Sequence, residues 1–486
     1  MSALRSVRRP RAARLAARAA PIALGLVLVA GTTASAAVSL TRVSVDVYTD
    51  TQAQHRTEVE PGTFAFGSTI VSAFQVGRVF GGGASNIGWA TSRNGGATWS
   101  HGYLPGITGN GGGPYGQASD ASVAFDAKHR VWLIASLGLG SSVDVLVNRS
   151  AKGGVAWGKP VTVTTGSNDK DWIACDNTPA SPHFGNCYIE YDVTNLGDSL
   201  VMKTSTDGGL TWGPARGPTG AAAGLGGQPV VQPNGTVVVP YESVVNGSIR
   251  SFASLDGGAT WTATTLISQV SHHGVAGSLR ESPLPSAAID SAGTVYVTWA
   301  DCRFRAGCTS NDIILAKSTG PSTWRAPVRV PIDPVPSTVD HFVPGIAVDS
   351  STSGATARIG LTYYYYPNAS CTASTCKLDA GFISSANGGA TWSAPAQIAG
   401  PMSLSWLPRT SQGVMFGDYI ATAIVAGGNA YPVIPVGQAP AGSTFHQAMY
   451  VPAGGLAVTG GSRAASAAHS HRFPPQPAPR LPVTAR

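Results

Sequence analysis

The segment Ser92-Arg-Asn-Gly-Gly-Ala-Thr-Trp99 recurs along this chain of 486 residues. The further copies are Ser205-Thr-Asp-Gly-Gly-Leu-Thr-Trp212, Ser254-Leu-Asp-Gly-Gly-Ala-Thr-Trp261 and Ser385-Ala-Asn-Gly-Gly-Ala-Thr-Trp392, and degenerate copies end at Trp157 and Trp324. Asn-Gly or Asp-Gly supplies the positive φ of a tight turn, and the Ser and Asp or Asn side chains can bond nearby backbone. The repeat therefore predicts six hairpin turns, each closed by an apolar Trp, rather than six metal or sugar sites.

Composition agrees with many short strands. Charged residues make up 12% of the chain, which holds 60 Gly, 34 Pro and 43% hydrophobic residues. These values argue against a coiled coil, a helical solenoid and acidic disorder. The formal net charge of +7 comes from ten Arg in residues 1–36 and 461–486, which hold no acid, so residues 37–460 carry −3. Binding to nucleic acid needs clustered cations and is not expected.

The chain begins with a predicted secretory signal. An Arg-rich start precedes an apolar run, Pro21 to Ala30, and the small-residue site Ala34-Ser35-Ala36, with cleavage expected before Ala37. The apolar run is too short to span a bilayer, and no transmembrane segment is expected. The six Cys form three close pairs, which predict local disulfides in a secreted protein. The pairs are Cys175/Cys187, Cys302/Cys308 and Cys371/Cys376.

The repeats resemble the Asp-boxes, or bacterial neuraminidase repeats, of the sialidase superfamily. The resemblance covers about residues 90 to 395. It implies an all-β propeller of four-stranded antiparallel blades, with each box on the turn between the third and fourth strands, remote from the active site.

The chain ends predict the number of blades. Three strand-like segments follow the last repeat, at 418–424, 430–436 and 445–451, and one lone strand-like segment at 38–48 follows the signal. Pairing them closes a seventh blade and leaves no open edge. A six-bladed ring, as in sialidases, is the alternative. We expect one propeller domain over 37–460 and a disordered Pro/Ala-rich basic tail over 461–486.

Ligands of propellers usually meet the rim opposite the box turns, where second strands end and first strands begin. On this basis Glu242, Tyr241 and Tyr364 are the candidate catalytic residues. The candidate substrate-binding residues are Arg78, Glu190, Asp192, Arg280, Arg303 and Arg305. First strands begin near Glu58, Glu60, Asp120, Asp169, Lys170, Asp171, Glu281, Asp340, His341, Asp418 and Tyr419. No metal-binding residue is predicted, and no cofactor is expected, with a structural calcium ion left open.

The resemblance implies an exo-glycosidase that acts on sialylated or related extracellular glycans, with three Arg on the sugar carboxylate, a Tyr nucleophile activated by Glu, and an Asp acid/base. The alternatives are a non-catalytic propeller that binds glycan or protein, and a polysaccharide lyase or hydrolase with paired carboxylates. Val59 stands where the family has its first Arg, and the loop from Gly81 to Asn86 lacks the acid/base Asp. We expect a secreted monomer whose partner is an extracellular glycan.

Overall fold

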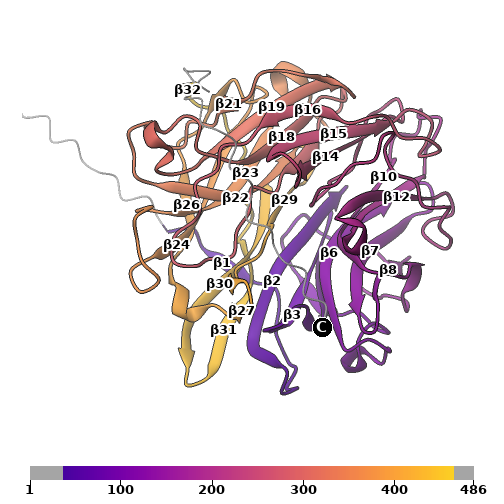
Figure 1. Cartoon of the computed structure of the whole chain (residues 1–486), viewed down its shortest axis with the longest axis horizontal. Coiled ribbons are helices and arrows are strands. Elements are labelled where there is room, and N and C mark those ends of the chain that lie inside the picture. Colours follow the sequence, from indigo (N-terminus) through magenta and orange to yellow (C-terminus); the bar gives the residue numbers. More distant parts are fainter. Residues whose placement is uncertain (1–36, 465–486) are drawn as a thin grey trace, which may run out of the picture. The chain divides into compact units, whose positions relative to one another are not determined.

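A computed structural model of the chain describes residues 37–464. The predicted signal segment, and the predicted tail beyond Ala464, lie outside the described residues. The described chain is a β-propeller in which the sheets follow one another in sequence order (Figure 1). Helix occurs there only as short 3-10 turns. These turns are η1 (Gly109–Gly111), η2 (Thr194–Leu196), η3 (Ala306–Cys308), η4 (Gly354–Thr356) and η5 (Leu404–Trp406).

Five sheets stand as separate blades of three to five strands. Two of them are formed by β10 (Asn168–Cys175), β11 (Cys187–Val193) and β12 (Ser199–Ser205), and by β13 (Val230–Val231), β14 (Val237–Ser243), β15 (Ser248–Ser254) and β16 (Thr265–Gln269). The next two are formed by β17 (Ser286–Ile289), β18 (Val295–Asp301), β19 (Asp312–Gly320), β20 (Thr323–Trp324) and β21 (Val328–Arg329), and by β22 (Asp340–Val348), β23 (Ile359–Tyr366), β24 (Lys377–Ser385) and β26 (Ala396–Ser403).

The fifth blade joins the two ends of the described chain. Its strands are β29 (Ala421–Ile424), β30 (Ala430–Ala441), β31 (Thr444–Pro452) and β1 (Leu40–Arg42). β1 pairs antiparallel with β31, with Leu40 opposite Pro452. In Figure 1 the indigo start of the chain accordingly lies beside the yellow end. The expected pairing of the segment after the signal with the last strands is confirmed.

The expected count of seven separate four-stranded blades is wrong. Besides the five separate blades there is one eight-stranded sheet. Its strands are β2 (Ala53–Phe66), β3 (Thr69–Val79), β4 (Ala84–Ser92), β5 (Ser100–Tyr103), β6 (Gln117–Asp126), β7 (Val131–Leu139), β8 (Val143–Ser150) and β9 (Val161–Thr164). The physical reason is a backbone pairing of β4 with β6, Ala84 opposite Ala118, which joins the two halves. Strand number also varies, because one separate blade has only three strands.

The four well-matched repeats directly follow β4, β12, β15 and β24, and they form the predicted turns. In the first repeat the Ser92 Oγ accepts the Gly96 N–H at 2.8 Å, and the Asn94 Oδ1 accepts the Thr98 N–H at 2.9 Å. The Trp99 Nε1 donates to the Gly96 carbonyl at 3.2 Å. These bonds satisfy the backbone of a turn that two glycines close.

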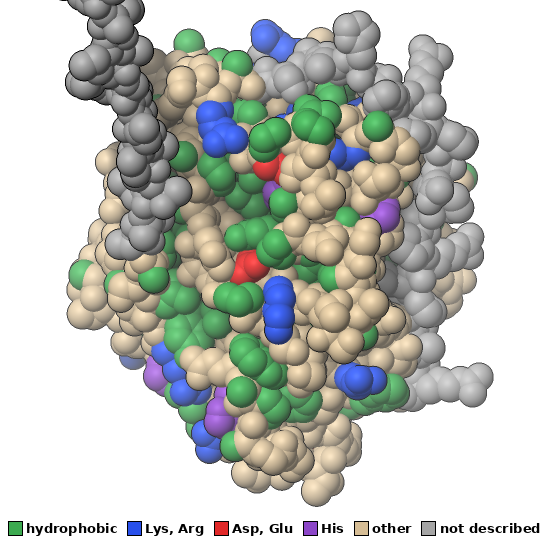
Figure 2. All heavy atoms as spheres, turned by 90° about the vertical axis from the view of Figure 1, so that its left-hand side faces the viewer, with side chains coloured by type: hydrophobic (Ala, Val, Ile, Leu, Met, Phe, Trp, Pro, Cys, Tyr) green, Lys and Arg blue, Asp and Glu red, His purple; other side chains and the backbone are tan. Residues whose placement is uncertain are grey.

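Short strand pairs complete the described fold. β25 (Thr391–Trp392) pairs with β32 (Arg463–Ala464), and β27 (Arg409–Thr410) pairs with β28 (Gly413–Val414). All three predicted disulfides form, between Cys175 and Cys187, Cys302 and Cys308, and Cys371 and Cys376. No helix among residues 37–464 is long and apolar enough to cross a membrane. On the face in Figure 2, Lys and Arg are scattered among hydrophobic and uncharged side chains, except at the lower left, where several gather with His.

Four innermost strands share a β-bulge that the sequence pattern does not reveal. The register of β6, β10 and β22 shifts at one place each, and that of β2 shifts at two. In each strand a residue with positive φ lies within a shift: Glu60 at 55°, Asp120 at 33°, Lys170 at 52° and Val343 at 46°. A bulge re-aims the side chain at the shift. Three of these four residues are charged, and they lie at the site described next.

Candidate functional site

A pocket of about 80 Å³ opens where β2, β6 and β10 bulge. We call it the charged pocket. Its charged lining residues are Glu60, Arg78, Asp120, Asp169, Lys170 and Arg280. Gly81, Gly82, Gly83, Ser411 and Gln412 also line it. The charged pocket thus draws on segments that are far apart in the sequence.

One carboxylate organises the cations of the charged pocket. The Lys170 Nζ lies 2.7 Å from Asp418 Oδ2 and 3.8 Å from Asp120 Oδ1. The Arg280 Nε donates to Asp418 Oδ1 at 2.8 Å, and its Nη2 bonds Asp418 Oδ2. The backbone N–H of Asp418 donates to Glu60 Oε1 at 3.0 Å. Because Asp418 is buried and paired twice, it fixes the positions of Lys170 and Arg280.

Arg78 differs from the other two cations because it has no ion pair among residues 37–464. Its Nη1 donates to the Gln75 Oε1 at 2.6 Å, and its Nε has no hydrogen-bond partner there. The side chain is nevertheless buried, with 3% of the residue exposed. Burial, together with the charge of nearby Arg280, lowers the pKa of Arg78. A buried guanidinium without a carboxylate partner favours an anion in the pocket that it lines.

Two acids of the charged pocket have pKa values near neutrality. Burial and the neighbouring Asp418 raise the pKa of Glu60 to about 7. Burial and Asp120 raise the pKa of Asp169 to about 7, although Lys170 acts in the opposite sense. By contrast, although burial alone would raise it, Arg280 and Lys170 hold the pKa of Asp418 well below its usual range. Asp169 is partly exposed and Glu60 is buried, so Asp169 is the better placed to exchange a proton with a ligand.

Tyr419 does not line the charged pocket, but it bonds the bulge of β6, whose Asp120 does. Its hydroxyl accepts the Ala121 N–H at 2.9 Å and lies 3.4 Å from Asp120 Oδ1. Its ring meets Trp172 edge to face, with 5.3 Å between ring centroids. Burial and the nearby carboxylates raise the pKa of Tyr419, so this hydroxyl stays protonated at neutral pH.

Of the residues predicted from the sequence, Arg78 and Arg280 line the charged pocket. Glu190 and Asp192 are buried on β11, and no carboxylate oxygen of either has a hydrogen-bond partner in the described chain. Burial raises the pKa of both well above the usual range. Neither residue lines the charged pocket.

The predicted catalytic residues lie in the core. Tyr241 packs against Phe252, and Tyr364 packs against Phe416 with 4.3 Å between ring centroids. Glu242 is buried, and burial raises its pKa to about 8. None of these three residues lines the charged pocket.

Arg303 links its own blade to the preceding one, because it bonds Asp301 of β18 and Ser268 of β16. Its Nη2 lies 2.5 Å from Asp301 Oδ2, its Nη1 donates to Ser268 Oγ at 2.9 Å, and its guanidinium lies 5.9 Å from the Trp299 ring centroid. Most of the hydrogen-bond donors of Arg303 are therefore used to fix the end of β18 and the loop that the Cys302–Cys308 disulfide closes.

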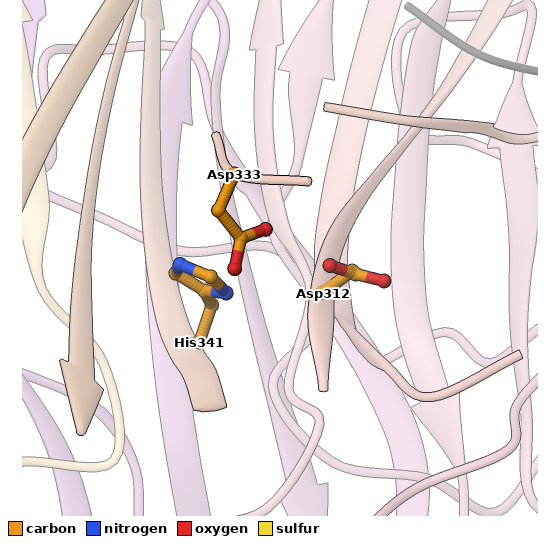
Figure 3. Close-up of side chains that lie close together, drawn as sticks. All are labelled: Asp312, Asp333 and His341. Atoms are coloured by element: carbon orange, nitrogen blue, oxygen red, sulfur yellow. The ribbon is translucent and has the colours of Figure 1, made fainter. Parts of the chain in front are cut away.

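Arg305 belongs to a cluster around Asp312, Asp333 and His341, whose ligand atoms lie within 4.8 Å of one another (Figure 3). The Arg305 Nη2 lies 2.5 Å from Asp312 Oδ1 and 2.7 Å from Asp333 Oδ1. Arg329 pairs with the same two carboxylates. Because two guanidinium groups already neutralise the two acids, this cluster is better described as a buried ion-pair network than as a cation site.

Lys170, Asp418, Asp169 and Asp120 were expected at first-strand starts but not chosen as site residues. The feature that singles them out is positional. Glu60, Asp120 and Lys170 each occupy the bulge of an innermost strand. This shared position follows from the strand register, which the alternation of residue types along the sequence does not encode.

Comparisons with known proteins give the fold. No protein-family model matches the chain, and no curated protein matches it. Its structure is similar to that of a PL25 polysaccharide lyase, an ulvan lyase, with 10% identity, 86% of this chain and 97% of that chain covered, and a TM-score of 0.51.

Two further solved structures are similar to a lesser degree. A mutant of NanB sialidase from Streptococcus pneumoniae has 13% identity, with 84% of this chain and 70% of that chain covered and a TM-score of 0.43. A protein of unknown function from Dyadobacter fermentans has 16% identity, with 72% of this chain and 99% of that chain covered and a TM-score of 0.45. At these identities the likeness concerns the fold alone.

Proposed function

We propose that this protein acts on acidic glycans outside the cell and that the charged pocket binds the anionic group of the sugar. The observation that carries the proposal is the buried guanidinium of Arg78, which lines the pocket without an ion-pair partner among residues 37–464. A carboxylate or sulfate would supply that partner and could accept two parallel hydrogen bonds. Lys170 and Arg280 add positive charge beside it.

The charge balance supports an anionic rather than a cationic ligand. The charged pocket and Asp418 together hold three cations and four carboxyl groups, of which Glu60 and Asp169 have pKa values of about 7. When these two are protonated, the set carries a net charge of +1. Binding of an anion favours this protonated state, because it removes the repulsion between the ligand and the two carboxylates.

We further propose that the reaction is glycosidic cleavage of the exo-glycosidase type, on sialylated or related sugars, with Asp169 as the proton donor. A carboxyl group with a pKa of about 7 is suited to general acid catalysis at neutral pH. The ulvan lyase of similar fold was solved with -[GlcA(1-4)Rha3S]- bound. That ligand makes uronic acids a second class of probe.

The test is a set of turnover assays with aryl sialosides and aryl glucuronides, and with a uronic-acid polymer monitored for unsaturated products. Wild-type protein should cleave one acidic class and no neutral analogue. Asp169→Asn should lower kcat by about 100-fold or more, with the thermal melt unchanged. Asp256→Asn is the matched control, since this exposed acid lies in a repeat turn and two sister repeats carry Asn.

Non-catalytic binding of acidic glycan is the second candidate, and one observation favours it. Val59 stands where the sialidase resemblance implies the first Arg. Asn86 stands at the end of the loop in which the resemblance implies the acid/base Asp. Asn86 is buried and donates to the Tyr48 hydroxyl at 2.9 Å and the Leu104 carbonyl at 3.1 Å, which is a packing role. Glycan binding without turnover on any of the three substrate classes would select this candidate.

Export and family membership belong to the same proposal. We propose that residues 1–36 are removed on secretion and that the repeats are sialidase-type Asp-boxes. The three disulfides support an oxidising compartment. N-terminal sequencing of protein from the culture medium should begin at Ala37, and gel filtration should give a monomer.

A further inference from the structure

The charged pocket is too small for a sugar ring. Its volume is about 80 Å³, whereas an engineered apolar cavity that holds benzene, a ring of similar size to a pyranose, measures about 150 Å³. A volume of this size corresponds to two or three water molecules at about 30 Å³ each. A carboxylate or a sulfate fits within it. The ring that bears such a group has to stay outside, against the residues at the mouth.

Two tight turns form that mouth. In the first, the Val79 N–H donates to the Gly83 carbonyl at 2.9 Å and the Gly82 N–H donates to the Val79 carbonyl at 3.3 Å. In the second, the Thr410 Oγ1 donates to the Gly413 carbonyl at 2.9 Å. The Ser411 N–H donates to the Phe80 carbonyl at 3.0 Å and ties the two turns together. The backbone at Phe80 is therefore held by neighbours on both sides.

Phe80 itself is exposed. Its relative exposure is 55%, although it sits between buried Val79 and Gly81, a lining residue of the charged pocket. Exposed aromatic rings cost free energy in water, and an aromatic side chain on a held backbone beside a lining residue of the pocket offers an apolar face to a ligand there. The C–H face of a pyranose is the part of a sugar that matches it.

We propose that the charged pocket takes only the carboxylate or sulfate substituent of an acidic sugar, while the sugar ring lies outside the pocket against Phe80. This inference rests on the proposed function and deepens it, because it assigns the two halves of the ligand to two separate parts of the protein. It predicts that Phe80 contributes to binding of the ring and not to binding of the anion.

Calorimetric titration of the purified protein with D-glucuronic acid, D-glucose and inorganic sulfate tests this division. Wild-type protein should bind glucuronic acid more tightly than sulfate, and glucose weakest. Phe80→Ala should weaken the binding of glucuronic acid about tenfold. It should leave the affinity for sulfate within about twofold of the wild-type value. Phe80→Tyr should retain wild-type affinity. Phe66→Ala is the matched control, because Phe66 is also exposed and lies at the opposite end of the β2–β3 hairpin.

The outcomes are distinct. If glucuronic acid binds but Phe80→Ala leaves its affinity unchanged, or weakens sulfate equally, the inference is overturned and the proposed function stands. If neither glucuronic acid nor sulfate binds to wild-type protein, both the proposed function and the inference fail.

Discussion

Arg280 and Asp418, 138 residues apart, form a two-point ion pair in which the Arg280 Nε donates to Asp418 Oδ1 at 2.8 Å. Asp418 also holds Lys170, and its backbone N–H holds Glu60. β2, β10 and the connecting segments that carry Arg280 and Asp418 are thereby fixed around one buried carboxylate. The charged pocket is consequently pre-organised before any ligand enters, which is what binding of a small anion requires.

Replacing Asp418 should destabilise the protein strongly. Asp418→Asn leaves the charges of Arg280 and Lys170 without their shared partner, and breaking a buried pair costs about 3–5 kcal/mol. The free energy of unfolding in urea measures this loss. Asp256→Asn, at an exposed site, should stay within about 0.5 kcal/mol of wild type. Equal stability of the two variants would contradict the organising role of Asp418.

The protein should lose stability as pH rises from 6.5 to 8. Burial raises the pKa of both Glu58 and Glu242 to about 8. Each carboxyl group therefore binds its proton more tightly in the folded protein than in the unfolded protein. The resulting stabilisation is complete below the unfolded pKa and is lost as pH approaches 8. Burial lowers the pKa values of His273 and His341 below 6.5. These two side chains make stability rise with pH, but only below pH 6.5, outside this window.

The expected slope is up to about 1.4 kcal/mol per pH unit for each acid. Thermal melts at pH 6.5, 7.25 and 8 measure it, and Glu58→Gln should flatten the fall. A Tm that stays constant or rises over this window is incompatible with protonated buried acids.

The repeat turns should contribute to stability and not to ligand binding. The Ser385 Oγ is buried, accepts the Gly389 N–H at 2.9 Å and donates to Asn387 Oδ1 at 3.0 Å. Ser385→Ala leaves that backbone N–H unsatisfied and should cost about 1–2 kcal/mol of unfolding free energy. Affinity for acidic sugar should not change, and exposed Ser374→Ala should alter neither quantity. A loss of affinity in Ser385→Ala would place the repeats in the binding site.

Arg78 should recognise the anion directly. Arg78→Met removes a hydrogen-bonding cation and should weaken the binding of glucuronic acid by about tenfold or more. The affinity for the methyl ester of the same sugar should change little. Arg250→Met is the matched control, because Arg250 lies on β15, in a different blade from Arg78, and donates to Thr264 of its own blade. Equal weakening of acid and ester by Arg78→Met would mean that Arg78 acts through packing alone.

Much of the fold could be predicted from the repeat and from strand patterning. The three disulfides and the pairing of β1 with β31 were expected, and the structure contains both. The blade count was wrong because it assumed that each repeat closes a separate sheet. The pairing of Ala84 with Ala118 depends on how two turns approach one another, which alternation of residue types does not encode.

The candidate site was predictable only in part. Arg78 and Arg280 were expected from their places at strand ends, and both line the charged pocket. The convergence of Glu60, Asp120 and Lys170 depends on bulges, where a shift of one residue changes the face to which a side chain points. A strict period of two cannot foresee such a shift.

A crystal structure of the protein with glucuronic acid tests the central claim most directly. The account predicts the sugar carboxylate in the charged pocket, within hydrogen-bond distance of the Arg78 guanidinium, with the ring outside the pocket. A glucuronic acid bound elsewhere on the propeller, with Arg78 unchanged and unliganded, would contradict it.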